Sequence, residues 1–175
     1  MNTSLVLTLV GPDRPGLVET VAQLVASHGG NWLESRMARL GGQFAGIARV
    51  VLPAAREGDL RAALGALEAR GLKVAVTLDP GSAPAAKPGR AVKLELVGQD
   101  RPGIVHQVTR VLAAHRVNVE ELVTECVEAP MAGGILFQAR AELLIPGEAD
   151  MGAIRTDLEK IAADLMVDLR FAEAK

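Results

Sequence analysis

The chain has 175 residues, 49% of them hydrophobic and 23% charged, and its formal net charge is −2. This length predicts one domain or two small ones. The near-neutral charge and an aromatic content of only 2% argue against direct binding of nucleic acid. No apolar stretch approaches the roughly 20 residues that cross a bilayer, and Met1-Asn2-Thr3 does not open a signal peptide. We therefore expect a cytoplasmic protein without membrane association.

Cys126 is the single cysteine, which excludes an internal disulfide and a Cys-x-x-Cys metal site. We expect it to serve as a small apolar residue within a strand. We expect neither a cofactor nor a bound metal.

The first predicted strand, residues 5–10, leads into the segment GPDRPGLV at residues 11–18. Apolar residues at helical spacing follow it. Because proline fits the first position of a helix, we place the helix start at Pro15, with Arg14 at the cap. The free N–H groups of Gly16, Leu17 and Val18 would then lie at the positive end of the helix dipole, where they can hold a small anion.

The rest of the first half predicts two strands, a helix and a last strand. Residues 28–31 (HGGN) end the first helix, and residues 32–40 and 44–52 form a hairpin around Gly41-Gly42. Leu60, Leu64 and Leu67 mark the second helix, and residues 72–78 alternate as a strand. The order is β-α-β-β-α-β. We assign residues 1–79 to a first domain, residues 80–91 to a linker rich in Pro, Gly and Ala, and residues 92–175 to a second domain.

The second half repeats the first. The segment GQDRPGIV at residues 98–105 corresponds to GPDRPGLV at an offset of 87 positions, which predicts a helix start at Pro102 with Arg101 at the cap. A strand is expected at residues 119–127. The following hairpin is six residues longer than its counterpart, and we expect its excess, around residues 128–132, to be poorly ordered. The last helix contains Ile154, Leu158 and Ile161, and the last strand is expected from Leu165 onward.

This order predicts an α+β protein made of two ferredoxin-like βαββαβ domains. Each would be a four-stranded antiparallel sheet with two helices on one face and strand order 4-1-3-2. The bare faces and edges are expected to bring the halves together, or two chains together in a homodimer.

An amino acid would suit the repeated turn. Helix amides would hold its carboxylate, Asp13 would accept its ammonium group, and a glycine-lined turn favours a small ligand. Plainer interpretations stay open: Asp13 and Asp100 as solvated carboxylates, Arg14 and Arg101 as surface arginines packing their stems, and Asn31 and Asn118 as capping residues after a helix.

The turn glycines and the two asparagines resemble the marks of the ACT domain, a small-molecule sensor with this strand and helix order. The resemblance implies an amino acid held between two domains, against the first turn and the second strand of a neighbour. The ligand-binding residues it implies, with those adjoining each turn, are Gly11, Asp13, Arg14, Gly16, Leu17, Asn31, Gly98, Asp100, Arg101, Gly103, Ile104 and Asn118.

The doubled motif, in a chain of this length without a catalytic domain, resembles the glycine cleavage system transcriptional repressor family. That resemblance implies a non-catalytic regulator of transcription, which senses a small, glycine-like amino acid and acts on a protein partner, such as a DNA-binding activator, rather than on DNA.

Three alternatives remain. A stand-alone amino-acid-binding module could regulate an enzyme. Small acyl-phosphate hydrolases share the chain order, but their Val-Gln-Gly-Val turn is missing, and no paired base and nucleophile appears. An RNA-binding sheet would need more aromatics than Phe44 and Phe137 supply. We therefore assign no catalytic residue.

Overall fold

The computed structural model describes residues 1–79, 81, 89–129 and 134–173, which belong to two compact units, Met1–Ala83 and Pro84–Lys175. Most of the predicted linker, residues 80–91, lies outside the described residues. Its last three residues already belong to a strand that begins at Gly89. Residues 130–133, the core of the hairpin that we expected to be poorly ordered, also lie outside the described part of the chain.

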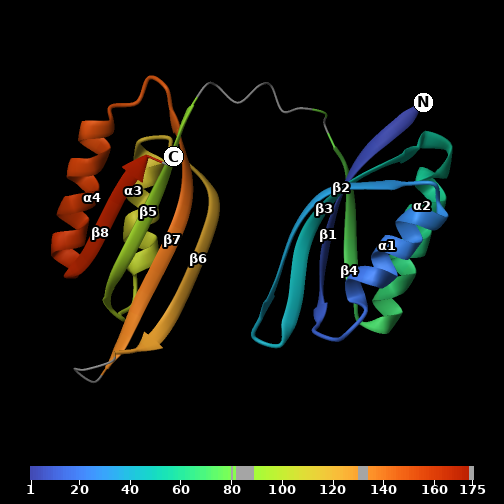
Figure 1. Ribbon diagram of the computed structural model, residues 1–175, viewed down its shortest axis with the longest axis horizontal. Helices are drawn as coiled ribbons and strands as arrows, with labels where there is room; N and C mark the ends of the chain where they lie inside the picture. The colour runs from blue at the N-terminus through green and yellow to red at the C-terminus, as the bar shows by residue number, and fades with distance from the viewer. Residues whose placement is uncertain (80, 82–88, 130–133, 174–175) are drawn as a thin grey trace. The chain divides into compact units, whose positions relative to one another are not determined.

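The first unit is one antiparallel sheet with strand order β2-β3-β1-β4 and helices on one face (Figure 1). Its elements are β1 (Asn2–Pro12), α1 (Leu17–Ser27), β2 (Asn31–Leu40), β3 (Gln43–Pro53), the 3-10 turn η1 (Ala54–Arg56), α2 (Glu57–Gly65), the 3-10 turn η2 (Ala66–Arg70) and β4 (Lys73–Leu78).

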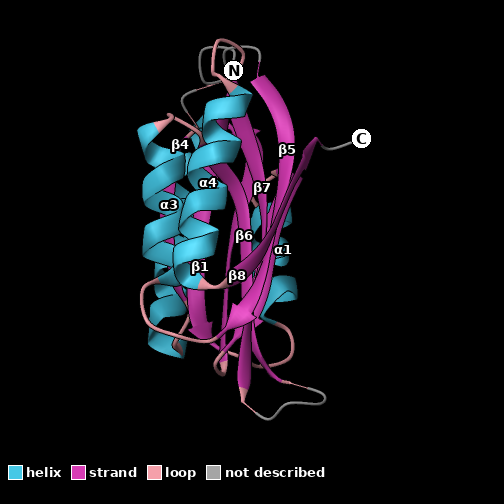
Figure 2. Cartoon of the chain, turned by 90° about the vertical axis from the view of Figure 1, so that its left-hand side faces the viewer, coloured by secondary structure: helices cyan, strands magenta, loops and turns pink. Residues whose placement is uncertain are grey.

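The second unit repeats this plan with strand order β6-β7-β5-β8. Its elements are β5 (Gly89–Gln99), α3 (Ile104–Ala114), β6 (Asn118–Glu128), β7 (Ile135–Pro146), α4 (Met151–Leu165) and β8 (Val167–Glu173). Figure 2 separates its helices from its strands by colour. The two units confirm the predicted α+β class and the strand order within each half.

Alternation along the strands explains why one face of each sheet is covered. Leu5, Leu7 and Leu9 of β1 are at most 2% exposed, and they face the helices because side chains two apart share a face. Helix α1 supplies Val21 and Val25 at helical spacing to the same core. Leu94 and Leu96 of β5 take the corresponding places in the second core.

Three predicted boundaries were wrong. Helices α1 and α3 begin at Leu17 and Ile104, two residues after the prolines, because Gly16 and Gly103 adopt φ angles of 87° and 95°. A left-handed residue cannot belong to a right-handed helix, so each glycine, and not Arg14 or Arg101, is the cap. Leu165 belongs to α4 rather than to the last strand, because it continues the buried stripe of Ile154, Leu158 and Ala162.

Candidate functional site

The turn between β1 and α1 exposes a helix start that no side chain caps. The first bond of the helix runs from the Thr20 N–H to the Gly16 carbonyl oxygen, 2.9 Å away. The amides of Leu17, Val18 and Glu19 precede it, and no side chain in the described part of the chain accepts from them. These amides replace the expected set of Gly16, Leu17 and Val18. By contrast, α4 is capped by Asp150, which accepts hydrogen bonds from Gly152 and Ala153.

The left-handed glycine leaves space above this helix start. A Cβ atom at Gly16 would meet no atom within 4 Å, so glycine is required there by its φ angle and not by crowding. The second turn is built alike: α3 has no side-chain cap, and the Gln107 N–H bonds the Gly103 oxygen at 3.0 Å. Both turns therefore offer uncapped amides at the positive end of a helix, the arrangement that binds small anions.

An ion pair closes one side of the first turn. In the sheet, Gly11 of β1 lies opposite Phe44 of β3, which lies opposite Arg39 of β2. From this row, Arg39 directs its Nε atom to within 2.7 Å of Oδ2 of Asp13. The backbone N–H of Asp13 donates to the Gly42 oxygen at 2.9 Å. The carboxylate that we expected to receive an ammonium group thus already has a cation.

The second turn lacks this cation. Gly98 lies opposite Phe137, and Phe137 lies opposite Cys126, so Cys126 occupies the position of Arg39. Cys126 is within the predicted strand but is exposed, contrary to our expectation of an apolar packing role. Partial desolvation of the sulfur, followed by the charge of Asp100 and a hydrogen bond to it, raises the pKa of the Cys126 thiol. A thiol is neutral and a thiolate is negative, so the Cys126 side chain supplies no positive charge to Asp100 in either form.

The turn arginines are held against the far end of the second helical segment of each unit. The Arg14 guanidinium donates from Nη2 to the Arg70 carbonyl oxygen at 2.8 Å. Arg101 donates from Nη2 to the Asp164 oxygen at 3.2 Å. Unsatisfied carbonyls at a helix end are good acceptors for cationic side chains. The geometry thus gives both arginines a structural hydrogen bond.

Gly11 and Gly98 are explained by packing within each unit. A Cβ atom at Gly11 would lie 2.6 Å from the Gly71 carbonyl oxygen, and one at Gly98 would lie 2.3 Å from Cγ1 of Val167. Both contacts are too short for any side chain. The close approach of the turn before β4 at Gly11, and of β8 at Gly98, therefore accounts for these two glycines without a ligand.

The structure does not bring Asn31 to the first turn. Asn31 lies opposite Val51, which lies opposite Ser4, so Asn31 lies seven residues along the sheet from the row of Gly11, roughly 23 Å at the usual rise of a strand. Asn118 is equivalent in the second unit, where its amide donates to the Glu120 carboxylate. Asp13, Arg14, Gly16 and Leu17 are brought together, as are their counterparts in the second turn.

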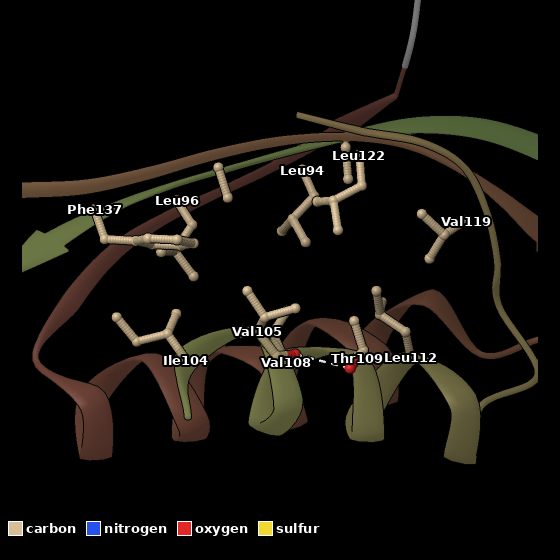
Figure 3. Close-up of a pocket in the computed structure, with 12 residues that line it drawn as sticks. Leu94, Leu96, Ile104, Val105, Val108, Thr109, Leu112, Val119, Leu122 and Phe137 are labelled. Atoms are coloured by element: carbon tan, nitrogen blue, oxygen red, sulfur yellow. Dashed lines mark hydrogen bonds between the residues drawn. The ribbon is translucent and has the colours of Figure 1, made fainter. Parts of the chain in front are cut away.

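An apolar cavity of about 30 Å³ lies in the second unit between α3 and the sheet (Figure 3). Its lining includes Ile104, Val108, Val119, Leu122 and Phe137. The hydroxyl of Thr109 points toward the helix backbone, where it donates to the Val105 oxygen at 2.7 Å. In the first unit, Trp32 holds the position of Val119 and packs against the core.

The histidines at the helix ends lie outside the two turns. His28 and His115 cap the C-terminal ends of α1 and α3, and His115 Nε2 lies 2.8 Å from Oδ2 of Asp157. Within the described ranges, no group of His, Cys, Asp and Glu side chains is arranged to hold a metal ion. None of the helices in these ranges is long and apolar enough to span a membrane.

Sequence reasoning missed the residues that distinguish the two turns. Arg39 lies on the second strand of the first unit and Cys126 on the second strand of the second unit. The sequences of the two turns do not indicate that these residues lie beside them. The hairpin at Gly41-Gly42 carries a usable signal, because counting back from its paired ends places Arg39 opposite Phe44. Glu19 and His106 differ at the third position of α1 and α3, a contrast that direct alignment of the repeats reveals.

The fold and the turns define the class: a tandem of βαββαβ domains, each with an uncapped helix start behind a left-handed glycine. A family model described as ACT domain matches residues 3–77 and again residues 92–172. The chain belongs to the ACT domain family.

Comparison with individual proteins adds to this assignment. The chain is 29% identical over 166 residues to the glycine cleavage system transcriptional repressor of Escherichia coli (strain K12), covering 92% of this chain and 85% of that protein. A crystal structure of an unknown protein from Galdieria sulphuraria is 31% identical, covers both chains fully and has a TM-score of 0.84. A crystal structure of a putative glycine cleavage system transcriptional repressor is 18% identical with a TM-score of 0.70, covering 100% of this chain and 99% of that one, and shares the fold.

Proposed function

We propose that this protein is a non-catalytic regulator that binds a small α-amino acid at the helix-start turn. The observation that carries the proposal is the uncapped set of amides behind a left-handed glycine, with an aspartate three residues before it. Helix amides suit the carboxylate of an amino acid, and an aspartate suits its ammonium group. Membership of the ACT domain family supports a regulatory role.

Transcription is the process that we propose the protein regulates. The Escherichia coli protein that shares 29% identity with this chain is named a glycine cleavage system transcriptional repressor, which makes glycine the first ligand to test. The net charge of −2 disfavours attraction to DNA phosphates. Action on a protein partner, such as a DNA-binding activator, therefore fits better than direct binding to an operator.

Calorimetric titration of the whole chain with glycine, alanine, serine and valine tests the proposal. We expect saturable binding of at least one of these amino acids, and the corresponding amines without a carboxylate should not bind. A chain that binds none of them would contradict the amino-acid-sensing role.

A further inference from the structure

The two turns differ in charge on both sides of the place where an amino acid would lie. We propose that the second domain alone provides the working amino-acid site, and that the first turn is a structural copy closed by the protein's own side chains. This inference rests on the proposed function and names which of the two equivalent sites performs it. Two independent substitutions between the repeats support it.

The first difference concerns the ammonium group. Arg39 Nε lies 2.7 Å from Asp13 Oδ2, and the Asp13 side chain is 32% exposed. An incoming ammonium group would have to displace this guanidinium or share the carboxylate with it, at the cost of an existing charge-assisted bond. At Asp100 the corresponding neighbour is the neutral thiol of Cys126. The carboxylate of Asp100 thus keeps its full negative charge for a cationic ligand.

The second difference concerns the carboxylate group. The first turn of α1 contains Glu19, whereas the first turn of α3 contains no acidic residue. Glu19 supplies the negative charge that the helix dipole favours, and it repels a second carboxylate at the same amides. The equivalent residue in α3 is His106, which has no carboxylate and leaves the amides of Ile104 and Val105 available.

Together, these differences give the two turns opposite preferences. At the first, both charges of an amino acid meet a group of like sign, Arg39 for the ammonium and Glu19 for the carboxylate. At the second, the corresponding residues are Cys126 and His106, which have neither the guanidinium of Arg39 nor the carboxylate of Glu19. The two turns differ in the side chains beside them. Their backbones are closely similar, with φ angles of 87° and 95° at the glycines.

Reciprocal exchange of these residues tests the inference by calorimetry with glycine, alanine, serine and valine as separate probes. Wild-type protein should bind one amino acid per chain. Cys126→Arg should weaken binding about tenfold or more, the scale of one hydrogen bond to a charged group, and Cys126→Ser should leave it nearly unchanged. Since Arg39 is tolerated at the equivalent position, Cys126→Arg should remain folded, which thermal unfolding would verify.

The opposite exchange should create a site. Arg39→Cys combined with Glu19→His should raise the stoichiometry from one amino acid per chain to two. Asp100→Ala should abolish wild-type binding, and Asp13→Ala should not change it. Wild-type stoichiometry of two, or loss of affinity on Asp13→Ala but not on Asp100→Ala, would overturn the inference while leaving the proposed function intact. A chain that binds none of the four amino acids would refute both.

Discussion

The Nε atom of Arg39 lies 2.7 Å from Oδ2 of Asp13, and it joins the second strand of the first domain to the turn before α1. The Arg39 side chain is 71% exposed, and exposed ion pairs contribute little to stability because water screens them. Arg39→Ala should therefore lower the free energy of unfolding by less than about 1 kcal/mol, as measured by urea denaturation. A larger loss would mean that the pair maintains the turn, and binding data on Arg39 variants would then need a different interpretation.

Gly16 should be intolerant of a side chain for a purely conformational reason. Its φ of 87° lies in the left-handed region, although the space around it is open. Gly16→Ala should destabilise the first domain by about 1–2 kcal/mol, measured by urea denaturation.

Gly65 is the matched control. It has helical angles and equally open surroundings, so Gly65→Ala should stabilise the domain by about 0.5–1 kcal/mol. Equal effects of the two substitutions would show that the left-handed conformation at Gly16 does not matter.

Acid should weaken the first domain through Asp79. A hydrogen bond from Ser4, at 2.8 Å, and then the charge of Arg49, at 2.7 Å, lower the pKa of this carboxyl. Its folded pKa is below the unfolded one, so its contribution is complete above the ordinary aspartate pKa of about 4 and is lost as pH falls through the lowered value. Asp79→Asn should flatten the dependence of stability on pH below about pH 4.

Thermal unfolding between pH 2 and 6 checks this expectation. Asp59→Asn provides the control, because that carboxylate is 62% exposed in an ion pair with Arg56. If the Asp79 and Asp59 variants had identical pH profiles, Asp79 would have no special part in acid sensitivity.

The cavity beside α3 predicts a stabilising substitution. Val119 takes the place that Trp32 holds in the first domain, and it lines the apolar cavity of about 30 Å³. Val119→Trp should stabilise the second domain by about 0.5–2 kcal/mol by filling this space. Val123→Trp, on the other face of the same strand, should have no such effect, because Val123 is 54% exposed. Differential scanning calorimetry should separate these outcomes; a lower transition temperature for Val119→Trp would indicate overpacking.

Direct DNA binding should be absent. The chain carries 19 Lys and Arg residues against 21 Asp and Glu residues, and affinity for duplex DNA depends largely on neutralising phosphates. Purified protein should give no sequence-dependent mobility shift at physiological salt, with or without an amino acid. A specific shift by the protein alone would contradict the proposed action through a protein partner.

Most of the fold could be predicted from the sequence because its signals are local and occur twice. The alternation of leucines in β1, the spacing of Val21 and Val25 in α1, and the Gly41-Gly42 hairpin each follow from residues that are near one another in the chain. The predicted helix starts were wrong because they were placed at the prolines. A Pro-Gly pair is typical of a first helical turn, and the sequence does not indicate that Gly16 has a left-handed φ angle.

The site was less predictable because its decisive contacts join distant residues. The turn sequence suggested Asp13 as a ligand group, but Arg39 reaches it from another strand. Likewise, Arg14 donates to the Arg70 oxygen, 56 positions along the chain. Asn31 was grouped with the turn through the resemblance alone, and strand register separates the two by most of the sheet's length. Motif positions therefore located the turn but did not identify its partners.

The bonds from Arg14 to Arg70 and from Arg101 to Asp164 have a mechanical consequence. Each joins the turn after the first strand to the C-terminal end of the last helical segment of its domain, and in the second domain the two bonded residues are 63 positions apart. A ligand that moves the turn of the second domain must either break the hydrogen bond from Arg101 to Asp164 or move the C-terminal end of α4 together with the turn. Ligand binding at this turn would then change the position of α4, a helix that contributes no residue to the turn. A partner protein bound to the outer surface of α4 would respond to the ligand without contacting it.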